Sequence, residues 1–238
     1  MPSRVVAAAA VWAFVVSATP GAQTGDAPAL LRAIDHVVYA TPDLSSGVRR
    51  IETLLGIQAT PGGQHPGEGT RNALIALGPT SYLEIIGPDP DQPKPDHARR
   101  FGIDDLTAPR VVTWAAKGTN LTQFVADARR RGVPLGDVLP GSRRTPAGVL
   151  LSWHVTDQRA VAANNGLVPF FIDWGVTPHP AKTAAPGATL LSLRGEHPNP
   201  ENVQRLLGEL GLQLPVAKGA SPSLVATIVG ARGRVELR

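Results

Sequence analysis

The chain contains no cysteine among its 238 residues. Disulfides and a cysteine nucleophile are therefore excluded, so packing alone must hold the fold together. Aromatic residues make up only 5% of the sequence, and the formal net charge of +4 is too small to indicate binding to nucleic acid. The sequence also has no Gly-x-Ser-x-Gly motif and no nucleotide-binding fingerprint, which excludes the enzyme classes that carry those signatures.

Long apolar runs are also missing, except at the N-terminus. Arg4 is followed there by uncharged apolar residues from Val5 to Val16, and then by small residues up to Ala22. This order favours a secretory signal peptide at residues 1–22 and a secreted or periplasmic protein. The run is short for a transmembrane helix, which needs about 20 residues. An uncleaved anchor is the alternative interpretation; after cleavage we expect no membrane contact.

Glycine and proline are abundant, with 25 and 23 residues. They fall between short apolar runs, a pattern that favours many short strands and turns over a helical bundle. The hydrophobic fraction of 42% is sufficient for a buried core.

A strand, a turn and an amphipathic helix that ends near glycine recur three times along the chain. The predicted strands and helices are 34–40 and 44–55, 111–116 and 120–131, and 189–193 and 199–210. Each helix is followed by strand signals, at 72–77 and 81–86, at 149–155 and 167–174, and at 223–229 and 234–237. Asn120 and Asn199 are predicted N-caps of the second and third helices.

These repeats predict an α+β fold built from tandem units at residues 30–88 and 109–175. A third, shorter unit at 187–238 is expected to pack on the same domain. Proline-rich linkers at 87–95 and 177–187 separate the units. One unit alone leaves a sheet face uncovered, so two units must pair and form a cup, and the sequence allows unit one to pair with unit two or with unit three.

Two polar residues interrupt apolar strands: His36 lies in the run 34–40, and Glu84 lies in the run 82–86. Side chains alternate faces along a strand, so both residues lie on surfaces that would otherwise be buried, with Asp35 facing away. A buried carboxylate costs several kcal/mol unless it is paired or coordinated. His36, or a cation held between His36 and Glu84, is the expected partner.

The segment 62–70 has four glycines and one histidine, His65. Glycine lets the backbone approach a ligand closely, although the segment could equally be a plain hairpin connection. Asn72, in the strand that follows, is a candidate for hydrogen bonding to a substrate. Arg71 is either an ion-pair partner of Glu84 or a further substrate contact.

The motifs at 34–40, 62–74 and 82–84 resemble the vicinal oxygen chelate superfamily, and within it the glyoxalase-like domain branch. The resemblance implies tandem βαβββ modules that form cupped, barrel-like mixed sheets with the helices outside. It also implies a divalent metal ion, such as zinc, manganese, nickel or iron, held by the first and last strands of a module. His36 and Glu84 match these two ligand positions.

The second unit does not match the superfamily cleanly, because residues 112–114 (Val-Thr-Trp) stand where a second histidine is expected. Asp173 and Glu236 are the candidate replacement ligands. Trp114, His154 and Trp174 are candidates for lining a substrate pocket. The remaining histidines, His97, His179 and His197, lie in polar or proline-rich loops and are expected on the surface.

Two functions remain open at this stage. The first is a metal-dependent lyase or isomerase that acts on a small oxygenated metabolite through an enediolate-like intermediate, with Glu84 and His65 moving the proton. The second is a protein that binds a small molecule in the same cup without chemistry. Neither requires nucleic acid, and a homodimer is possible.

Overall fold

The computed structural model describes residues 29–160 and 165–238. The predicted signal peptide at residues 1–22 therefore lies outside the described residues. A short helix, α1 (Ala29–Ala33), leads into the first half of a large sheet, which comprises β1 (Ile34–Ala40), α2 (Leu44–Leu55), β2 (Thr60–His65), β3 (Thr70–Gly78) and β4 (Ser81–Pro88). The 3₁₀ helix η1 (Arg100–Asp105) then leads to the second half.

The second half comprises β5 (Arg110–Lys117), α3 (Leu121–Arg130), β6 (Val138–Arg144), β7 (Leu150–Thr156) and β8 (Phe170–Asp173). After the 3₁₀ helix η3 (Pro180–Lys182), the chain continues with β9 (Thr189–His197), α4 (Pro200–Glu209), β10 (Val216–Lys218), β11 (Ser223–Gly230) and β12 (Gly233–Leu237). Within the part of the chain that the structure describes, no helix is both long and apolar enough to span a membrane.

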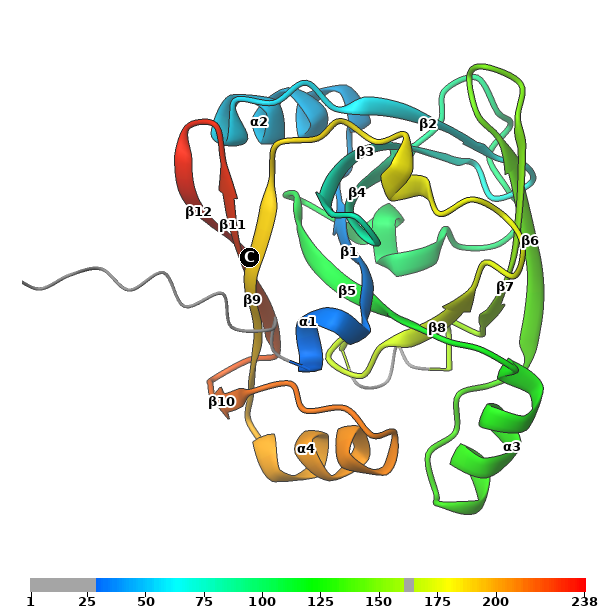
Figure 1. Ribbon diagram of the computed structural model, residues 1–238, viewed down its shortest axis with the longest axis vertical. Helices are drawn as coiled ribbons and strands as arrows, with labels where there is room; N and C mark the ends of the chain where they lie inside the picture. The colour runs from blue at the N-terminus through cyan, green and yellow to red at the C-terminus, as the bar shows by residue number, and fades with distance from the viewer. Residues whose placement is uncertain (1–28, 161–164) are drawn as a thin grey trace, which may run out of the picture.

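Eight strands form one mixed sheet in the order β2-β3-β4-β1-β5-β8-β7-β6. The opening strands of the two halves meet at its centre, where β1 pairs with β5 in antiparallel and with β4 in parallel orientation. The sheet curls until its edge strands β2 and β6 lie side by side, so it is nearly closed into a barrel (Figure 1). This arrangement confirms the predicted α+β, barrel-like fold, and it shows that unit one pairs with unit two.

The third unit forms a separate four-stranded sheet in the order β10-β9-β11-β12. This sheet lies beside the barrel, next to β5 and α2 (Figure 1). Its buried residues Leu193, Leu224 and Ile228 belong to the same hydrophobic core as Ile34 and Trp114 of the barrel. The third unit therefore supports the outer surface of the barrel and contributes no strand to it.

Helix α2 begins and ends at the predicted residues. Asp43 caps its N-terminus by accepting a 2.7 Å hydrogen bond from the Ser46 amide, and Gly56 ends it in the left-handed conformation. Asn199 caps α4 as predicted, through the Asn202 amide. Asn120 precedes α3, but its own backbone is left-handed and its side chain makes no capping hydrogen bond, so that prediction is wrong in its mechanism.

The structure has one more strand after each helix than the sequence pattern predicts. These additional strands, β2, β6 and β10, come directly after the three helices and precede the predicted strands. All three lie at the edge of a sheet. The segments Thr-Pro-Gly-Gly-Gln-His and Val-Leu-Pro-Gly-Ser-Arg-Arg, which form β2 and β6, contain proline and glycine, and edge strands tolerate both residues. These edge strands therefore form although their sequences lack the apolar alternation that predicts a strand.

The two edge strands β2 and β6 meet along a line that we call the seam. Among the described residues, no ladder of backbone hydrogen bonds joins them there. Gly63 has a φ of 137°, and a Cβ atom there would lie 2.2 Å from the carbonyl oxygen of Arg144. Only glycine permits this approach of the two edges. Across the same seam, the Arg143 guanidinium donates a hydrogen bond to the carbonyl oxygen of Gly62.

Candidate active site

The barrel encloses a cavity of about 280 Å³. Strand alternation decides which residues line it, because every second side chain points inward. From the first half these inward residues are His36, His65, Thr70, Asn72, Tyr82, Glu84 and Ile86, and from the second half they include Arg143, Trp153, Val155, Phe170 and Ile172. The first half thus supplies most of the polar groups, and the second half supplies mostly apolar ones.

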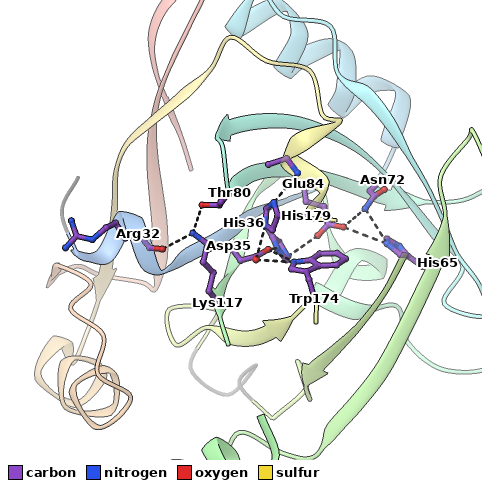
Figure 2. A network of polar contacts seen from close by, with 11 residues as sticks. Arg32, Asp35, His36, His65, Asn72, Thr80, Glu84, Lys117, Trp174 and His179 are labelled. Atoms are coloured by element: carbon purple, nitrogen blue, oxygen red, sulfur yellow. Dashed lines mark hydrogen bonds and ion pairs between the residues drawn. The ribbon is translucent and has the colours of Figure 1, made fainter. Parts of the chain in front are cut away.

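Glu84 lies at the centre of the polar groups and is 7% exposed. Its Oε1 accepts a 2.6 Å hydrogen bond from the Asn72 amide, and its Oε2 lies 3.7 Å from Nε2 of His36 (Figure 2). Nε2 of His65 lies 3.9 Å from Oε1. The two imidazoles therefore face the carboxylate without hydrogen bonding to it, which confirms that His36 and Glu84 converge in one cavity.

The ring of His36 is held on three sides. It stacks on Tyr82 with the ring centroids 4.7 Å apart, and the edge of Phe170 packs against it. Its Nδ1 lies 2.8 Å from Oδ1 of Asp35. A carboxylate at Nδ1 fixes the ring orientation and directs Nε2 toward Glu84 and the cavity.

Asp35 is 1% exposed, and it does not face away as the strand pattern predicts. Besides His36, it contacts Nε1 of Trp174 and Nε2 of His179, each 3.1 Å from Oδ2 (Figure 2). The pairing of β1 with β5 shifts register between Ile34 and His36, and such irregularities redirect side chains. The prediction that His179 lies on the surface is therefore wrong.

The charge of Asp35 is retained despite its burial. Burial alone would raise its pKa, but the hydrogen bonds from His179 and His36 outweigh that effect and lower the pKa to about 2. Asp35 is thus a carboxylate at neutral pH, buried against three donor side chains.

His65 completes the polar cluster from the seam side. Its Nδ1 lies 3.0 Å from the Thr70 hydroxyl, and its Nε2 lies 3.4 Å from the Asn72 amide nitrogen. Burial lowers its pKa to about 4, with the charge of Arg143 adding to that effect and the charge of Glu84 opposing it. His65 is therefore neutral at pH 7, and Nδ1 donates to Thr70 if Nε2 accepts from Asn72.

Asn72 fixes both Glu84 and His65 through one amide nitrogen. Its carbonyl oxygen Oδ1 is buried and has no hydrogen-bond partner among the described residues. That oxygen points at Gly62, where a Cβ atom would lie 2.1 Å away. The expected placement of Asn72 and His65 beside the site is confirmed, while their chemical roles stay predictions.

Asp173 and His154 lie outside the cavity for a common reason. They oppose each other across β8 and β7, whereas their neighbours Ile172 and Val155 form the inward pair. Asp173 accepts a hydrogen bond from the amide of Gly175 instead. The expectations that Asp173 binds a metal ion and that His154 lines the pocket are therefore wrong by one position along each strand, because both side chains lie on the outer face of the barrel.

Trp114, Arg71 and Glu236 also lie away from the site. Trp114 is fully buried on the outer side of β5 and donates to the carbonyl of Leu167, so it belongs to the core. Arg71 is directed outward and pairs with Asp91, at 2.9 Å, and Asp89, and it makes no ion pair with Glu84. Glu236 lies in the third sheet and pairs with Arg194. Of Trp114, His154 and Trp174, Trp174 is the one that lines the cavity.

The donor set does not fit the divalent-metal site that the resemblance implies. The inward positions of the second half, where further ligands are expected, hold Phe170, Ile172 and Val155. Across residues 29–160 and 165–238, no three His, Asp or Glu side chains are grouped closely enough to hold a metal ion. His36 and Glu84 thus form half of such a site, without the predicted ligands Asp173 and Glu236.

Fold and cavity together define a class of protein: a nearly closed barrel of two strand-helix-strand halves, with polar groups converging inside it. The model of one family, described as a glyoxalase-like domain, matches residues 34–211. The chain belongs to this glyoxalase-like domain family. No curated protein matches the sequence.

Several solved structures are similar to this chain to different extents. A hypothetical protein from Staphylococcus aureus is 13% identical, with a TM-score of 0.58, covering 85% of this chain and 83% of that one. Methylmalonyl-CoA epimerase from Mycobacterium tuberculosis is 18% identical, with a TM-score of 0.40, over 63% of this chain and 91% of its own. A Streptomyces coelicolor epimerase variant in complex with 2-nitronate-propionyl-CoA is 21% identical, with a TM-score of 0.41, over 62% and 97%. At 13% identity, the similarity to the Staphylococcus aureus protein concerns the fold alone.

Proposed function

We propose that the protein is an enzyme that removes a proton from a small oxygenated substrate and returns it, with Glu84 as the base. The reaction would be of the lyase or isomerase type and would pass through an enediolate-like intermediate. One observation carries this proposal: Oε1 of Glu84 is fixed by Asn72, while Oε2 faces the cavity and makes no hydrogen bond among the described residues. A positioned carboxylate oxygen that is not engaged by another side chain is the acceptor that general-base catalysis needs.

His36 is suited to stabilise the negative charge that develops on a substrate oxygen. Asp35 is ionised and holds Nδ1, which leaves Nε2 directed at the cavity and at Oε2 of Glu84, so a proton carried on Nε2 would point at a bound substrate oxygen. His65 is neutral and faces the same carboxylate, which suits it to exchange a proton with Glu84. The three side chains thus supply a base, a donor and a shuttle around one substrate position.

The proposal assigns proton transfer to these side chains themselves, because only His36 and Glu84 of the predicted metal ligands face the cavity. A divalent ion would find only these two protein ligands among the described residues, fewer than the three or more that protein metal sites supply, so no step of the proposal uses one. Elemental analysis of the purified protein, before and after dialysis against a chelator, measures whether such an ion is part of the site.

The experiment is solvent deuterium exchange, followed by proton NMR, on a panel of small 2-oxo and 2-hydroxy acids and their neutral analogues. The wild-type protein should catalyse exchange at the carbon next to the carbonyl for at least one compound. Glu84→Gln should lower that rate by about 100-fold or more while leaving binding nearly intact. Quenching of Trp153 and Trp174, which line the cavity, measures binding in the same samples.

A second candidate function is a non-catalytic small-molecule binder. The apolar inner wall of the second half favours it, because Phe170, Ile172 and Trp153 suit an apolar or aromatic ligand better than a small polar one. Binding of panel compounds without exchange, unaffected by Glu84→Gln, would support the binder and contradict the enzyme.

The proposal also includes secretion of the protein after cleavage of a signal peptide, and its association into a homodimer. The apolar N-terminal segment supports secretion with cleavage near Ala22. N-terminal sequencing of the protein from the extracellular or periplasmic fraction tests this, since an uncleaved Met1 would contradict it. A homodimer would be seen by light scattering coupled to size-exclusion chromatography.

A further inference from the structure

Two arginines reach the cavity, and they differ in how their charge is neutralised. Arg100 forms a two-pronged ion pair with Glu68, at 3.0 and 2.9 Å, and donates a third hydrogen bond to Gln158. Its charge is therefore already matched by a carboxylate. Arg143 has no such carboxylate partner within the part of the chain that the structure describes.

Arg143 is 3% exposed, which makes it one of the most deeply buried charged residues described. The only acceptor that its guanidinium contacts is the carbonyl of Gly62, across the seam, and no carboxylate lies within ion-pair distance among the described residues. A buried cation without a counter-ion is unfavourable by several kcal/mol unless something neutralises it. Arginine keeps its proton in proteins, so deprotonation does not remove the cost.

The surroundings of Arg143 make an anionic ligand the natural partner. Burial lowers its pKa, whereas the nearby charge of Glu84 opposes that effect, so the two groups interact across the cavity. Glu84 itself, however, is hydrogen-bonded to Asn72 and directed at His36. The guanidinium fork has five donors, and a carboxylate fills two of them with parallel hydrogen bonds.

Position in the fold strengthens this interpretation. Arg143 comes from β6 and Glu84 from β4, and both line the same cavity as Ile172. A substrate whose carboxylate contacts Arg143 would therefore extend its remaining atoms toward the Glu84 and His36 pair. The cavity volume of about 280 Å³ admits a small molecule in this space.

We propose that the substrate is a small carboxylic acid and that Arg143 binds its carboxylate. This inference rests on the function proposed above, because it names the substrate class of the same site. It assigns to Arg143 the selection and orientation of the substrate, and leaves proton removal to Glu84. The competing interpretation is that Arg143 only clasps β6 to β2 through Gly62.

The test compares small acids with amides of nearly the same shape: pyruvate with pyruvamide, and lactate with lactamide. Quenching of tryptophan fluorescence gives the affinities. Wild-type protein should bind at least one acid about tenfold more tightly than its amide, and Arg143→Met should abolish that preference. Arg143→Lys, which keeps the charge but loses the fork, should retain part of it.

Arg144→Met is the matched control, because Arg144 is the exposed neighbour on the same strand and its side chain donates to the carbonyl of Gly148. It should leave the acid preference unchanged. If Arg143→Met lowers stability and the preference persists, Arg143 is only a clasp and the assignment is overturned. Should Arg143→Met fail to fold, the wild-type preference and its reduction in Arg143→Lys decide the question.

The outcomes separate this inference from the proposed function. Acids that bind through Arg143 without any deuterium exchange would uphold the substrate class and contradict the enzyme. Exchange on amides at the same rate and affinity as on acids would uphold the enzyme and overturn the role of Arg143. If no acid in the panel binds better than its amide to the wild-type protein, the assignment is overturned.

Discussion

The two halves of the barrel have the same order of elements but opposite inner walls. Strands β1 to β4 direct His36, His65, Asn72 and Glu84 inward, whereas β7 and β8 direct Trp153, Val155, Phe170 and Ile172 into the same space. Arg143 on β6 is the charged exception in the second half, which also contributes Ser142 and Gln158 to the lining. The same order of strands and helices therefore determines which positions point into the cavity in each half. It does not determine whether the residues at those positions are polar or apolar.

This difference also separates the chain from the symmetric arrangement that the family resemblance implies. Ligands on both halves would surround a metal ion, whereas ligands on one half and an apolar wall on the other create a polar cluster beside a hydrophobic surface. Under the proposed function, a substrate would lie between the polar groups that carry the chemistry and the apolar surface that packs against it. The predictions below test that division of labour, from the largest expected effect to the smallest.

Asp35→Asn should have the largest effect, because the carboxylate serves three donors in the interior: His36, Trp174 and His179. We expect the free energy of unfolding at pH 7 to fall by about 3 kcal/mol, measured by urea denaturation. Exchange at saturating substrate should fall as well, because His36 loses the group that orients it. Asp91→Asn, which breaks a largely exposed pair with Arg71, is the control and should cost less than about 1 kcal/mol.

The Asp35 effect has a defined pH dependence. Its pKa of about 2 in the folded protein lies below the ordinary value of 3.8, so its contribution to stability is present above pH 4 and is lost as the pH falls toward 2. Asp35→Asn should lack this acid-sensitive part. Equal slopes of stability against pH in the variant and the wild type, between pH 4 and 2, would contradict the buried ionised carboxylate.

His65 should give the next effect. Its pKa is about 4 in the folded protein against 6.5 ordinarily, because burial disfavours the charged imidazole. Stability should therefore be complete above pH 6.5 and should fall by about 3 kcal/mol as the pH drops to 4, since the unfolded chain takes up the proton first. His65→Gln should lose this part of the pH dependence. An NMR titration midpoint for His65 near 6.5 would contradict its burial as a neutral group.

Asp173→Asn should give the smallest effect and mark the boundary between the inner and outer faces of the barrel. Asp173 lies on the outer face of β8, so its loss should change the free energy of unfolding by no more than about 0.5 kcal/mol and leave exchange and metal content unchanged. A large loss of either property would return Asp173 to the site and restore a second-half ligand.

Much of this fold can be predicted from the sequence because its central elements have strong local signals. The apolar spacing of Ile51 and Leu55, with Gly56 ending the helix, predicts α2 with the correct bounds. The edge strands β2, β6 and β10 cannot be found in this way, because edge positions need no apolar alternation. The pairing of the first two units depends on contacts between segments that are distant in the sequence, and local sequence patterns do not predict such contacts.

The residues of the site also fall into two groups: those that local sequence signals predict and those that they do not. His36 and Glu84 are predictable because each is a polar residue inside an apolar strand, and strand parity then places both in the interior. Asp35 and His179 are not, since their contact joins residues 144 positions apart and depends on an irregularity in β1. Asp173 and His154 show the limit of parity, because a shift of one residue in an assumed register exchanges the inner and outer faces. Arg143 cannot be found in this way either, because the segment that forms β6 lacks the apolar alternation that predicts a strand.

The most direct test of the central claim compares one residue from each half in the same exchange assay. At saturating substrate, Glu84→Gln should lower the rate of solvent deuterium exchange by about 100-fold or more, whereas Ile172→Ala should lower it by less than about tenfold and mainly weaken binding. Thermal unfolding confirms that both variants are folded. If Ile172→Ala loses as much exchange as Glu84→Gln, or if Glu84→Gln retains the wild-type rate, catalysis does not reside in the polar half.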